Sequence, residues 1–314
     1  MAPDPIFTDF DSHHVELWSH TPLRLSHRLD RSPLFTDEAL GALIDSYPRD
    51  GFSLVRWGEQ GADRGSWREG ELGGLSGREV IAAIGRSKLW INLRDVGAVD
   101  PRYAALRDGI FAELKERMPE IGMFGEKIGI LISSPGSRTL YHADLPGQCL
   151  WQMRGTKRVY VYPSAPPFIR PEHVEAIALS GVEVNMPYRP WYDAHAQVYD
   201  LEPGQMLHWP LNAPHRVDNH DCLNVSMTME YFTPAIRRNH MVTVANGILR
   251  HKLGVTPHSR DTAGAGFWAK ALFQKGLKNT AWVRKENKPR KPSSFVLDRD
   301  QPDAVRDLPL QAAE

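Results

Sequence analysis

The sequence predicts an α+β fold with an all-β core and helical additions at both ends. Three observations support this class: helical periodicity before residue 120, many short apolar or alternating runs between residues 127 and 232, and helical periodicity again after Phe232. Turns that contain Gly and Pro separate the short runs, a pattern typical of a barrel or a sandwich. With 314 residues and 41% hydrophobic content, the chain is large enough for such a core.

Three stretches before residue 120 have the pattern of amphipathic helices: 36–47, 76–84 and 100–114. Each begins at a polar residue that favours a helix N-cap, namely Thr36, Ser76 or Asp100, and continues with apolar residues at three- and four-residue spacing. Apolar runs that predict strands lie between them, at 52–57 and 89–93. We expect residues 1–120 to form an N-terminal extension packed on the core.

From residue 127 the pattern becomes that of strands. Six short runs are apolar or alternate between apolar and polar residues: 128–133, 148–153, 158–162, 197–201, 205–209 and 223–232. A helix at 171–179 is predicted within an insert near 164–195. The resulting domain division is a β core over 121–235, C-terminal helices over 236–280, and a basic, flexible tail over 281–314.

Charge and cysteine content limit the classes of partner and compartment. The chain has 38 Lys and Arg against 38 Asp and Glu, which argues against nucleic-acid binding over its whole surface. Residues 270–291 nevertheless carry a local charge of +7, since they hold eight basic residues and one acidic residue. Two cysteines, Cys149 and Cys222, exclude a disulfide framework, and no run approaches the roughly 20 apolar residues of a membrane span. Because no secretion signal is visible, we expect a cytoplasmic protein.

Two histidines and one aspartate have the spacing of a metal site. His142 and Asp144 are two residues apart, which on a strand places both side chains on one face. His215 follows a Pro-bounded turn and leads into the long final strand. Two imidazoles and one carboxylate are the ligand set of the facial triad of non-haem Fe(II) oxygenases, which leaves three octahedral positions open for chemistry. We therefore expect His142, Asp144 and His215 to be metal ligands and catalytic residues.

The residues around these ligands resemble the two signature motifs of the cupin superfamily. The first motif contains, at matching spacing, Gly136, His142, Asp144, Gln148 and Gly155, and the second contains Gly204, Pro210, His215 and Asn219. The resemblance implies a double-stranded β-helix, the cupin or jelly-roll fold, whose hairpin turns lie at the glycines. Asn212 stands where the second motif has a glycine, and Asn tolerates the left-handed conformation better than most residues.

Two departures from the cupin motifs indicate which group of cupin proteins the chain resembles. Simple metal cupins have a second His and a Glu where this chain has Asp144 and Gln148. This replacement resembles that of the JmjC-type, cupin-like 2-oxoglutarate oxygenases, and the stretch is most similar to their asparaginyl hydroxylase branch. Gln148, at the position of the lost ligand, is a candidate to contact substrate or to order Asp144.

The same resemblance implies a site for 2-oxoglutarate. Lys157 matches the lysine that pairs with the far carboxylate of this cosubstrate, and Thr139 matches a hydroxyl that assists it. The three-residue spacing between Thr139 and His142 requires curvature of the strand. Asn224 and Ser226 begin a polar row on the final strand, which either lines the metal cavity or faces solvent. Asn224 is a candidate cosubstrate contact, and Ser226 a candidate to contact substrate or to support the ligands.

The resemblance implies a dioxygenase that uses Fe(II), 2-oxoglutarate and O₂ to hydroxylate an unactivated C–H bond, with release of succinate and CO₂. Two alternatives are a metal-dependent cupin with isomerase or 2-oxoglutarate-independent dioxygenase activity, and a non-enzymatic cupin-like binding protein. The sequence does not decide whether the substrate is a protein side chain or a small metabolite. It also does not decide whether the reaction is hydroxylation or demethylation. We expect no membrane partner, nucleic-acid binding only through 270–291, and a homodimer contact through the C-terminal helices.

Overall fold

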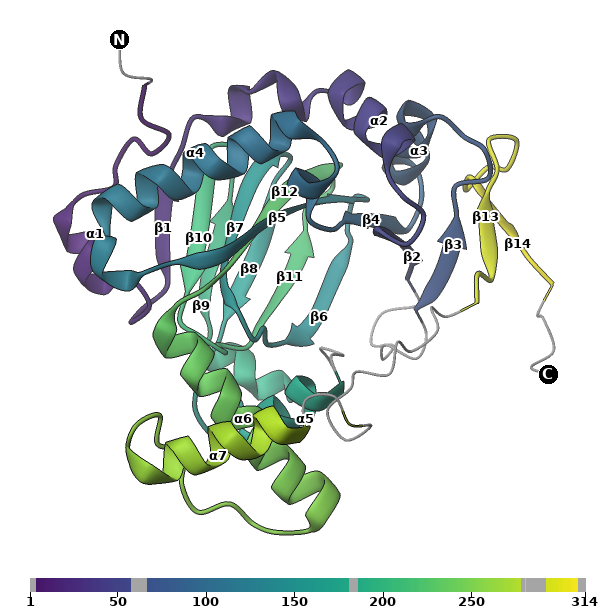
Figure 1. Cartoon of the computed structure of the whole chain (residues 1–314). Coiled ribbons are helices and arrows are strands. Elements are labelled where there is room, and N and C mark those ends of the chain that lie inside the picture. Colours follow the sequence, from purple (N-terminus) through teal and green to yellow (C-terminus); the bar gives the residue numbers. More distant parts are fainter. Residues whose placement is uncertain (1–3, 58–66, 181–185, 278–279, 281–291, 310–314) are drawn as a thin grey trace.

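The computed structural model describes residues 4–57, 67–180, 186–277, 280 and 292–309. Within these ranges the strands form one ten-stranded sheet and one four-stranded sheet, which face each other (Figure 1). The order of the large sheet is β1-β10-β7-β12-β5-β4-β2-β3-β13-β14, and that of the small sheet is β6-β11-β8-β9.

Eight strands divide between the two sheets to form the core. In chain order they are β5 (Phe124–Ser133), β6 (Arg138–His142), β7 (Gly147–Arg154), β8 (Lys157–Val161), β9 (Gln197–Leu201), β10 (Gln205–Trp209), β11 (His215–Asn219) and β12 (Asn224–Phe232). All their pairings are antiparallel, and β10-β7-β12-β5 faces β6-β11-β8-β9. This order is that of a double-stranded β-helix, so the predicted fold class is confirmed.

Strand alternation separates two apolar clusters on the two faces of the large sheet. The cluster between the sheets contains Leu150, Val159, Val161, Leu201, Leu207, Trp209, Ala213 and Val217. On the other face of β7, Cys149, Trp151 and Met153 belong to a larger cluster that includes side chains from the N-terminal helices. The residues of β7 that alternate with these, namely Gln148, Leu150 and Gln152, therefore face the interior between the sheets.

The N-terminal extension widens and covers the large sheet. Its strands are β1 (Leu23–Ser26), β2 (Phe52–Arg56), β3 (Arg68–Glu71) and β4 (Leu89–Leu93), and its helices are α1 (Ser12–Leu17), α2 (Asp37–Ser46), α3 (Gly77–Gly85) and α4 (Pro101–Arg117). The predicted N-caps hold, since Thr36 accepts from Ala39 N, Asp100 accepts from Arg102 N, and Ser76 forms a capping box with Glu79. Short 3₁₀ helices occupy η1 (Leu29–Arg31), η2 (Pro33–Phe35), η4 (Val96–Ala98) and η5 (Pro119–Ile121).

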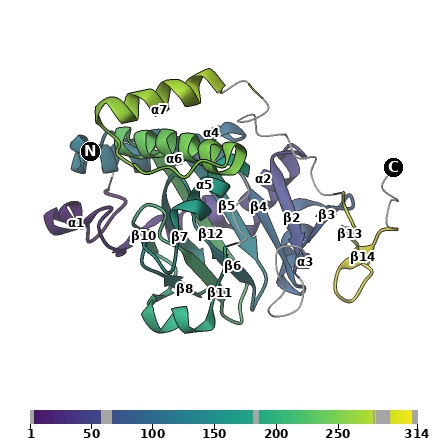
Figure 2. The same ribbon diagram turned by 90° about the horizontal axis from the view of Figure 1, so that it is seen from below.

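The remaining helices lie at one end of the β core. They are α5 (Pro171–Ser180) and η6 (Pro190–His195) in the insert between β8 and β9, followed after the core by α6 (Pro234–Leu253) and α7 (Gly264–Leu277). Figure 2 shows α6 and α7 side by side, where Val242 packs against Phe267 and Ala271. The fully buried Glu175 of α5 pairs with Arg250 of α6 at 2.7 Å and with Arg260 at 2.5 Å. Within the described residues, no helix combines the length and apolar character that crossing a membrane requires.

The expected flexible tail over 281–314 needs correction where the structure describes it. Strands β13 (Phe295–Leu297) and β14 (Val305–Asp307) pair with each other, and β13 also pairs in parallel with β3. Phe295 is fully buried, and its ring occupies the space that a side chain at Gly70 would need. Much of the basic segment 270–291 lies outside the described residues, which include its Lys270 and Lys275 on α7.

Candidate metal centre

The structure brings His142, Asp144 and His215 together at one end of the β core. One potential ligand atom from each residue lies within 4.8 Å of the others. Nε2 of His215 is 3.3 Å from Oδ2 of Asp144, and the two imidazole rings are 4.1 Å apart between centroids. A second group of this kind, Asp11, His13 and His14, is largely exposed at the start of α1.

Backbone contacts orient both histidine rings. Nδ1 of His142 is 2.7 Å from the carbonyl oxygen of Leu140, and Nδ1 of His215 is 3.1 Å from that of Ala213. Because a carbonyl only accepts, each Nδ1 carries the proton, and each Nε2 keeps the lone pair that can bind a metal ion. Burial, together with the neighbouring His142, holds the pKa of His215 well below its ordinary value, which favours the neutral, metal-binding form.

Asp144 is positioned by a loop rather than by the strand that carries His142. The sequence places His142 and Asp144 on one strand, whereas β6 ends at His142 and Asp144 lies in the connection to β7. Asn212 has the predicted left-handed conformation, with φ of 58°, and its Nδ2 donates to the carbonyl of Asp144 at 2.6 Å. The loop before β11 thus fixes the backbone at the carboxylate ligand.

His215 also begins a strand of its own. The sequence has it leading directly into the long final strand, but β11 and the turn at 220–223 come between His215 and β12. His215 pairs with His142 of β6 on one side and with Val161 of β8 on the other. The Trp209 ring packs 4.4 Å from the His215 ring, so the second histidine is held by strands on both sides and by an indole.

A bulge between β6 and β11 determines the direction of Thr139. His215 lies opposite His142 and Val217 lies opposite Thr139, so two steps along β11 match three steps along β6. Directly opposed residues of a sheet face the same side, and the extra residue in β6 therefore places Thr139 on the face that carries His142. The expected curvature is provided by this bulge. Thr139 is exposed, and β11 separates it from β8, which carries Lys157.

Lys157 begins β8 and faces the interior with Val159 and Val161. Its side chain is only 4% exposed. Burial lowers the pKa of Lys157 from 10.5 to about 7, while the neighbouring Cys222 acts in the opposite direction. A buried ammonium group is stabilised when an anion lies beside it, so a carboxylate next to Lys157 would offset the cost of its burial.

The start of the polar row on β12 is buried rather than solvent-facing. Asn224 and Ser226 are both fully buried. Asn224 Oδ1 accepts from Nε2 of Gln152 at 2.7 Å, and its Nδ2 donates to the carbonyl of Cys222 at 3.0 Å. Ser226 donates to Oε1 of Gln152 at 2.7 Å. Both predicted site residues thus belong to a network around Gln152, which the sequence analysis missed, although one amide in the apolar run CLWQM is a visible signal.

Gln148 lies near the metal end of the interior. It pairs across the large sheet with Trp209 of β10, which packs on His215, and with Glu230 of β12. Its side chain faces the interior and is 8% exposed overall. The structure therefore places Gln148 on the sheet opposite the histidine ligands.

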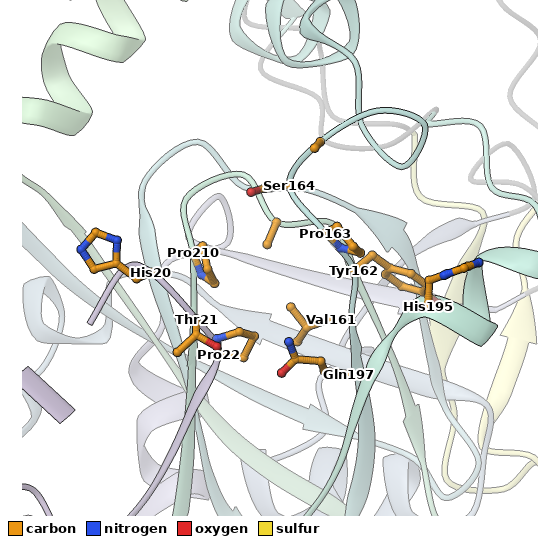
Figure 3. A pocket seen from close by; sticks show the side chains of 12 residues that line it. His20, Thr21, Pro22, Val161, Tyr162, Pro163, Ser164, His195, Gln197 and Pro210 are labelled. Carbon is orange, nitrogen blue, oxygen red and sulfur yellow. The ribbon is translucent and has the colours of Figure 1, made fainter. Parts of the chain in front are cut away.

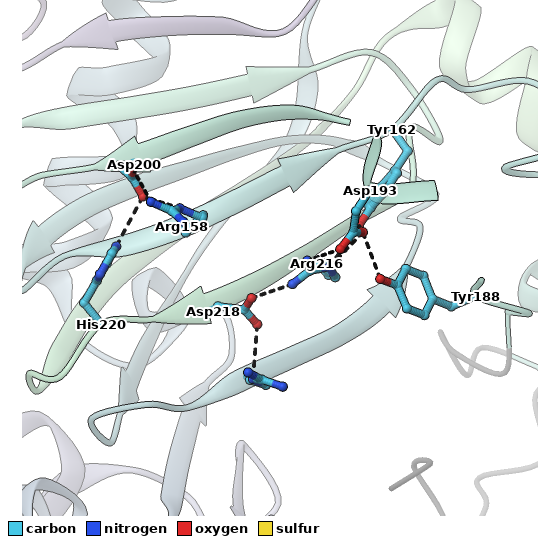
Figure 4. A network of polar contacts seen from close by, with 9 residues as sticks. Arg158, Tyr162, Tyr188, Asp193, Asp200, Arg216, Asp218 and His220 are labelled. Atoms are coloured by element: carbon cyan, nitrogen blue, oxygen red, sulfur yellow. Dashed lines mark hydrogen bonds and ion pairs between the residues drawn. The ribbon is translucent and has the colours of Figure 1, made fainter. Parts of the chain in front are cut away.

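The outer face of the small sheet, opposite to the interior face, carries a network of charged and polar side chains. Arg216, next to His215, donates to Asp193 of η6 at 2.6 Å, and Asp193 also accepts from the hydroxyls of Tyr162 and Tyr188 (Figure 4). The guanidinium of Arg216 stacks 3.4 Å from the ring centroid of Tyr160. These contacts tie the insert to the strand that begins with the second histidine.

A cavity of about 330 Å³ adjoins the end of the β core that carries His215 (Figure 3). It is lined by segments that precede β1, follow β8, precede β9 and precede β11, including His20, Val161, His195, Gln197 and Ala213. Val161 is paired with His215, and the carbonyl of Ala213 contacts the His215 ring. The cavity therefore lies beside the backbone that holds this histidine.

Known proteins match this chain by structure and not by sequence. No protein-family model matches it, and no curated protein matches it. The X-ray structure of Escherichia coli YcfD has a TM-score of 0.50 at 16% identity and covers 88% of this chain and 70% of that chain. A structure described as YcfD, a ribosomal oxygenase from Escherichia coli in complex with cobalt and 2-oxoglutarate, is 19% identical, covers 86% of this chain and 66% of that chain, and has a TM-score of 0.46.

A further structure of the same Escherichia coli ribosomal oxygenase, in complex with cobalt and succinic acid, is 18% identical, with coverage of 86% and 66% and a TM-score of 0.46. The similarity to the X-ray structure of YcfD confirms, for the fold, the resemblance that the two sequence motifs indicate. The chain shares the fold of YcfD, with a double-stranded β-helix as its core.

Proposed function

We propose that this protein is an Fe(II)- and 2-oxoglutarate-dependent dioxygenase that hydroxylates a C–H bond. The observation that carries the proposal is the convergence of two imidazoles and one carboxylate, His142, Asp144 and His215, within 4.8 Å of one another in a double-stranded β-helix. This set fits Fe(II) by donor type, and the backbone contacts at both Nδ1 atoms leave Nε2 available on each ring.

The three residues would hold the metal on one face and leave its other positions for cosubstrate and O₂. When bound, Fe(II) supplies the oxidation of 2-oxoglutarate by O₂ to succinate and CO₂, coupled to hydroxylation. The apolar residues between the sheets, Leu150, Val159 and Val217 among them, exclude water from the space behind the ligands. Trp209 restricts the His215 ring.

Lys157 is the proposed partner of the far carboxylate of 2-oxoglutarate. Its burial in the interior supports this role, because an ammonium group there gains most from a carboxylate. Thr139 and Asn224 are proposed as additional cosubstrate contacts. The bulge that turns Thr139 toward the face of His142 supports the first, and the position of Asn224 at the start of β12 supports the second. Gln148 and Ser226 are proposed to contact substrate or to support the ligands.

We propose a protein side chain as the substrate. YcfD, whose X-ray structure has the same fold, is described in another of its structures as a ribosomal oxygenase, which supports a macromolecular substrate for this chain. The cavity beside His215 gives such a substrate a place to enter between the insert and the segment before β1. A cytoplasmic location, a homodimer contact through α6 and α7, and nucleic-acid binding through 270–291 stay predictions.

Succinate release in air tests the proposal. Protein supplied with Fe(II) and 2-oxoglutarate should form succinate, and pools of peptides and metabolites should identify the substrate by stimulating release. Asp144→Ala is the matched control and should release none above background. Equal succinate from the wild type and this control would contradict the proposal. A product formed from substrate without 2-oxoglutarate, with retained activity in Lys157→Ala, would support the alternative of a metal-dependent cupin.

A further inference from the structure

Gln152 occupies an unusual place for an amide side chain. It lies in β7 between the apolar residues Trp151 and Met153, it is fully buried, and it faces the interior between the sheets. Burying an amide without hydrogen-bond partners is unfavourable in proteins. An apolar side chain at this position would avoid this cost. The role of Gln152 therefore depends on its hydrogen bonds rather than on the volume that it fills.

The amide makes four hydrogen bonds. Its Nε2 donates to the carbonyls of Arg154 at 2.7 Å and Gly155 at 3.0 Å, and to Oδ1 of Asn224 at 2.7 Å. Because the group has two N–H bonds for three acceptors, one of them is shared. Its Oε1 accepts from Ser226 Oγ at 2.7 Å. The opposite orientation of the amide would turn its oxygen toward two carbonyl groups, so the network fixes one orientation.

Two of these bonds hold the turn that leads into Lys157. Arg154 ends β7, Gly155 has a positive φ of 73°, and Lys157 begins β8 two residues later. A Cβ atom on Gly155 would lie 2.3 Å from the carbonyl oxygen of Leu223, so the turn is pressed against the segment before β12. Thr156 N also donates to Sγ of Cys222 at 3.2 Å. The turn before Lys157 is therefore held by Gln152, by the backbone of Leu223 and by Cys222.

We infer that Gln152 is a positioning residue for cosubstrate binding, which acts by fixing the Arg154–Thr156 turn and thereby the ammonium group of Lys157. This inference rests on the proposed function, since it assigns Lys157 to the far carboxylate of 2-oxoglutarate. Gln152 does not touch the cosubstrate in this account. A displaced turn would move the start of β8, while His142, Asp144 and His215 lie at the other end of the core strands and keep their places.

Anaerobic titration of 2-oxoglutarate into the Fe(II)-loaded full chain tests the inference, with the visible charge-transfer absorption as the readout. Gln152→Met keeps the length of the side chain and removes its hydrogen bonds. We expect its Kd for 2-oxoglutarate to rise about tenfold, while its Fe(II) affinity stays within about twofold of the wild type. A role in the core alone would lower stability without this separation of the two affinities.

Gln205→Met is the matched control. Gln205 lies directly opposite Gln152 on β10, and its Oε1 accepts from Glu202 N in a different turn, at 3.1 Å. Its Kd for 2-oxoglutarate should change by less than about twofold. Ser226→Ala, which removes the bond to Gln152 Oε1 and leaves the Gln152 amide in place, provides a second test if Gln152→Met does not fold. It should raise the Kd about threefold.

The outcomes separate the inference from the proposed function. A wild-type chain that develops no absorption with Fe(II) and 2-oxoglutarate contradicts the proposed function. A wild type that binds 2-oxoglutarate, with Lys157→Ala impaired and both Gln152→Met and Ser226→Ala unchanged, overturns the inference about Gln152 alone. Parallel losses of Fe(II) and 2-oxoglutarate affinity in Gln152→Met also overturn it, because the effect would then extend to the whole core.

Discussion

The two histidines of the proposed metal centre, His142 and His215, are oriented by the same kind of backbone contact. In each case Nδ1 contacts the carbonyl oxygen two residues earlier in the chain, Leu140 for His142 and Ala213 for His215. A histidine whose proton is fixed on one nitrogen presents the other to a metal without further reorganisation. The ligand set is thus prepared by the backbone around it.

Removing one of the three proposed ligands should greatly weaken metal binding without unfolding the chain. We expect Asp144→Ala to lower Co(II) or Fe(II) affinity by at least about 100-fold in anaerobic calorimetry, because two imidazoles alone hold the ion less well. His13→Ala, in the exposed group with Asp11 and His14, is the control and should leave the tightest binding step unchanged. If His13→Ala removed that step and Asp144→Ala kept it, the metal centre would be wrongly assigned.

Lys157 should make 2-oxoglutarate binding depend on pH. Its pKa in the folded chain is lowered to about 7 by burial, so above pH 7 the group is largely neutral before the cosubstrate binds. A carboxylate placed beside it favours the protonated form, and binding above pH 7 must therefore take up a proton. We expect affinity to fall from pH 7 to pH 9, approaching tenfold per pH unit.

Calorimetry in buffers of different ionisation enthalpy measures that proton uptake directly. Lys157→Met should bind 2-oxoglutarate weakly, with no proton uptake between pH 7 and pH 9. Wild-type binding that takes up no protons over this range would show that the ammonium of Lys157 does not face the carboxylate.

Residue types and spacing predicted that His142, Asp144 and His215 form one group, and the structure brings them together. The role of Lys157 rests on the family resemblance and stays a proposal. The role of Gln152 was not predictable, because its partners Asn224 and Ser226 lie more than seventy residues further along the chain. The direction of Thr139 depends on a bulge, and pairing of β6 with β11 decides where that extra residue falls.

The loop before β11 links Asp144 and His215, two proposed ligands that are far apart in the sequence. Asn212 adopts a left-handed conformation with φ of 58° and donates to the carbonyl of Asp144, three residues before His215 begins β11. One side chain therefore couples the position of the carboxylate to that of the second histidine. The glycine of the cupin motif supplies only the conformation, whereas Asn supplies a hydrogen bond as well.

Two substitutions separate these contributions. Asn212→Gly keeps access to the left-handed region and loses the bond, so it should lower the free energy of unfolding by about 1 kcal/mol. Asn212→Ala loses both and should lower it by about 2–3 kcal/mol. Urea denaturation measures both values. Equal losses would show that the left-handed conformation is not strained for Ala at this position.

Two strands of the β core, β6 and β11, are absent from the six predicted runs and have polar outer faces. β11 reads His-Arg-Val-Asp-Asn, and on its outer face Arg216 pairs with Asp218 and with Asp193. β6 is an edge strand with exposed residues at its start. Their apolar faces are too short to reveal strand periodicity, whereas buried strands such as β5 and β7 show long apolar runs.

Across the whole molecule, the large sheet joins the two ends of the chain. β13 pairs with β3 across more than two hundred residues, and β14 extends the sheet beyond it. Arg68 donates to Ser294 O at 2.7 Å and to Asp307 Oδ1 at 2.6 Å. The Lys- and Pro-rich composition just before β13 predicted flexibility, because local composition does not reveal a partner strand this distant.

Phe295→Ala should therefore destabilise the fold. Phe295 is fully buried against Gly70, and removing a buried phenyl ring costs about 3–5 kcal/mol. Trp268→Ala on α7 is the control, since Trp268 is 58% exposed and should change stability by less than about 0.5 kcal/mol. Chemical denaturation measures both, and an effect of Phe295→Ala as small as that of the control would restore the flexible-tail interpretation.

The most direct test of the central claim is anaerobic absorption spectroscopy of the purified chain with Fe(II) and 2-oxoglutarate. We predict that the wild type develops a weak visible charge-transfer band when both are present and not with either alone. Asp144→Ala should fail to develop it, and Lys157→Ala should require a much higher 2-oxoglutarate concentration. A wild-type chain that binds Fe(II) but develops no band at saturating 2-oxoglutarate would contradict its assignment as a 2-oxoglutarate-dependent dioxygenase.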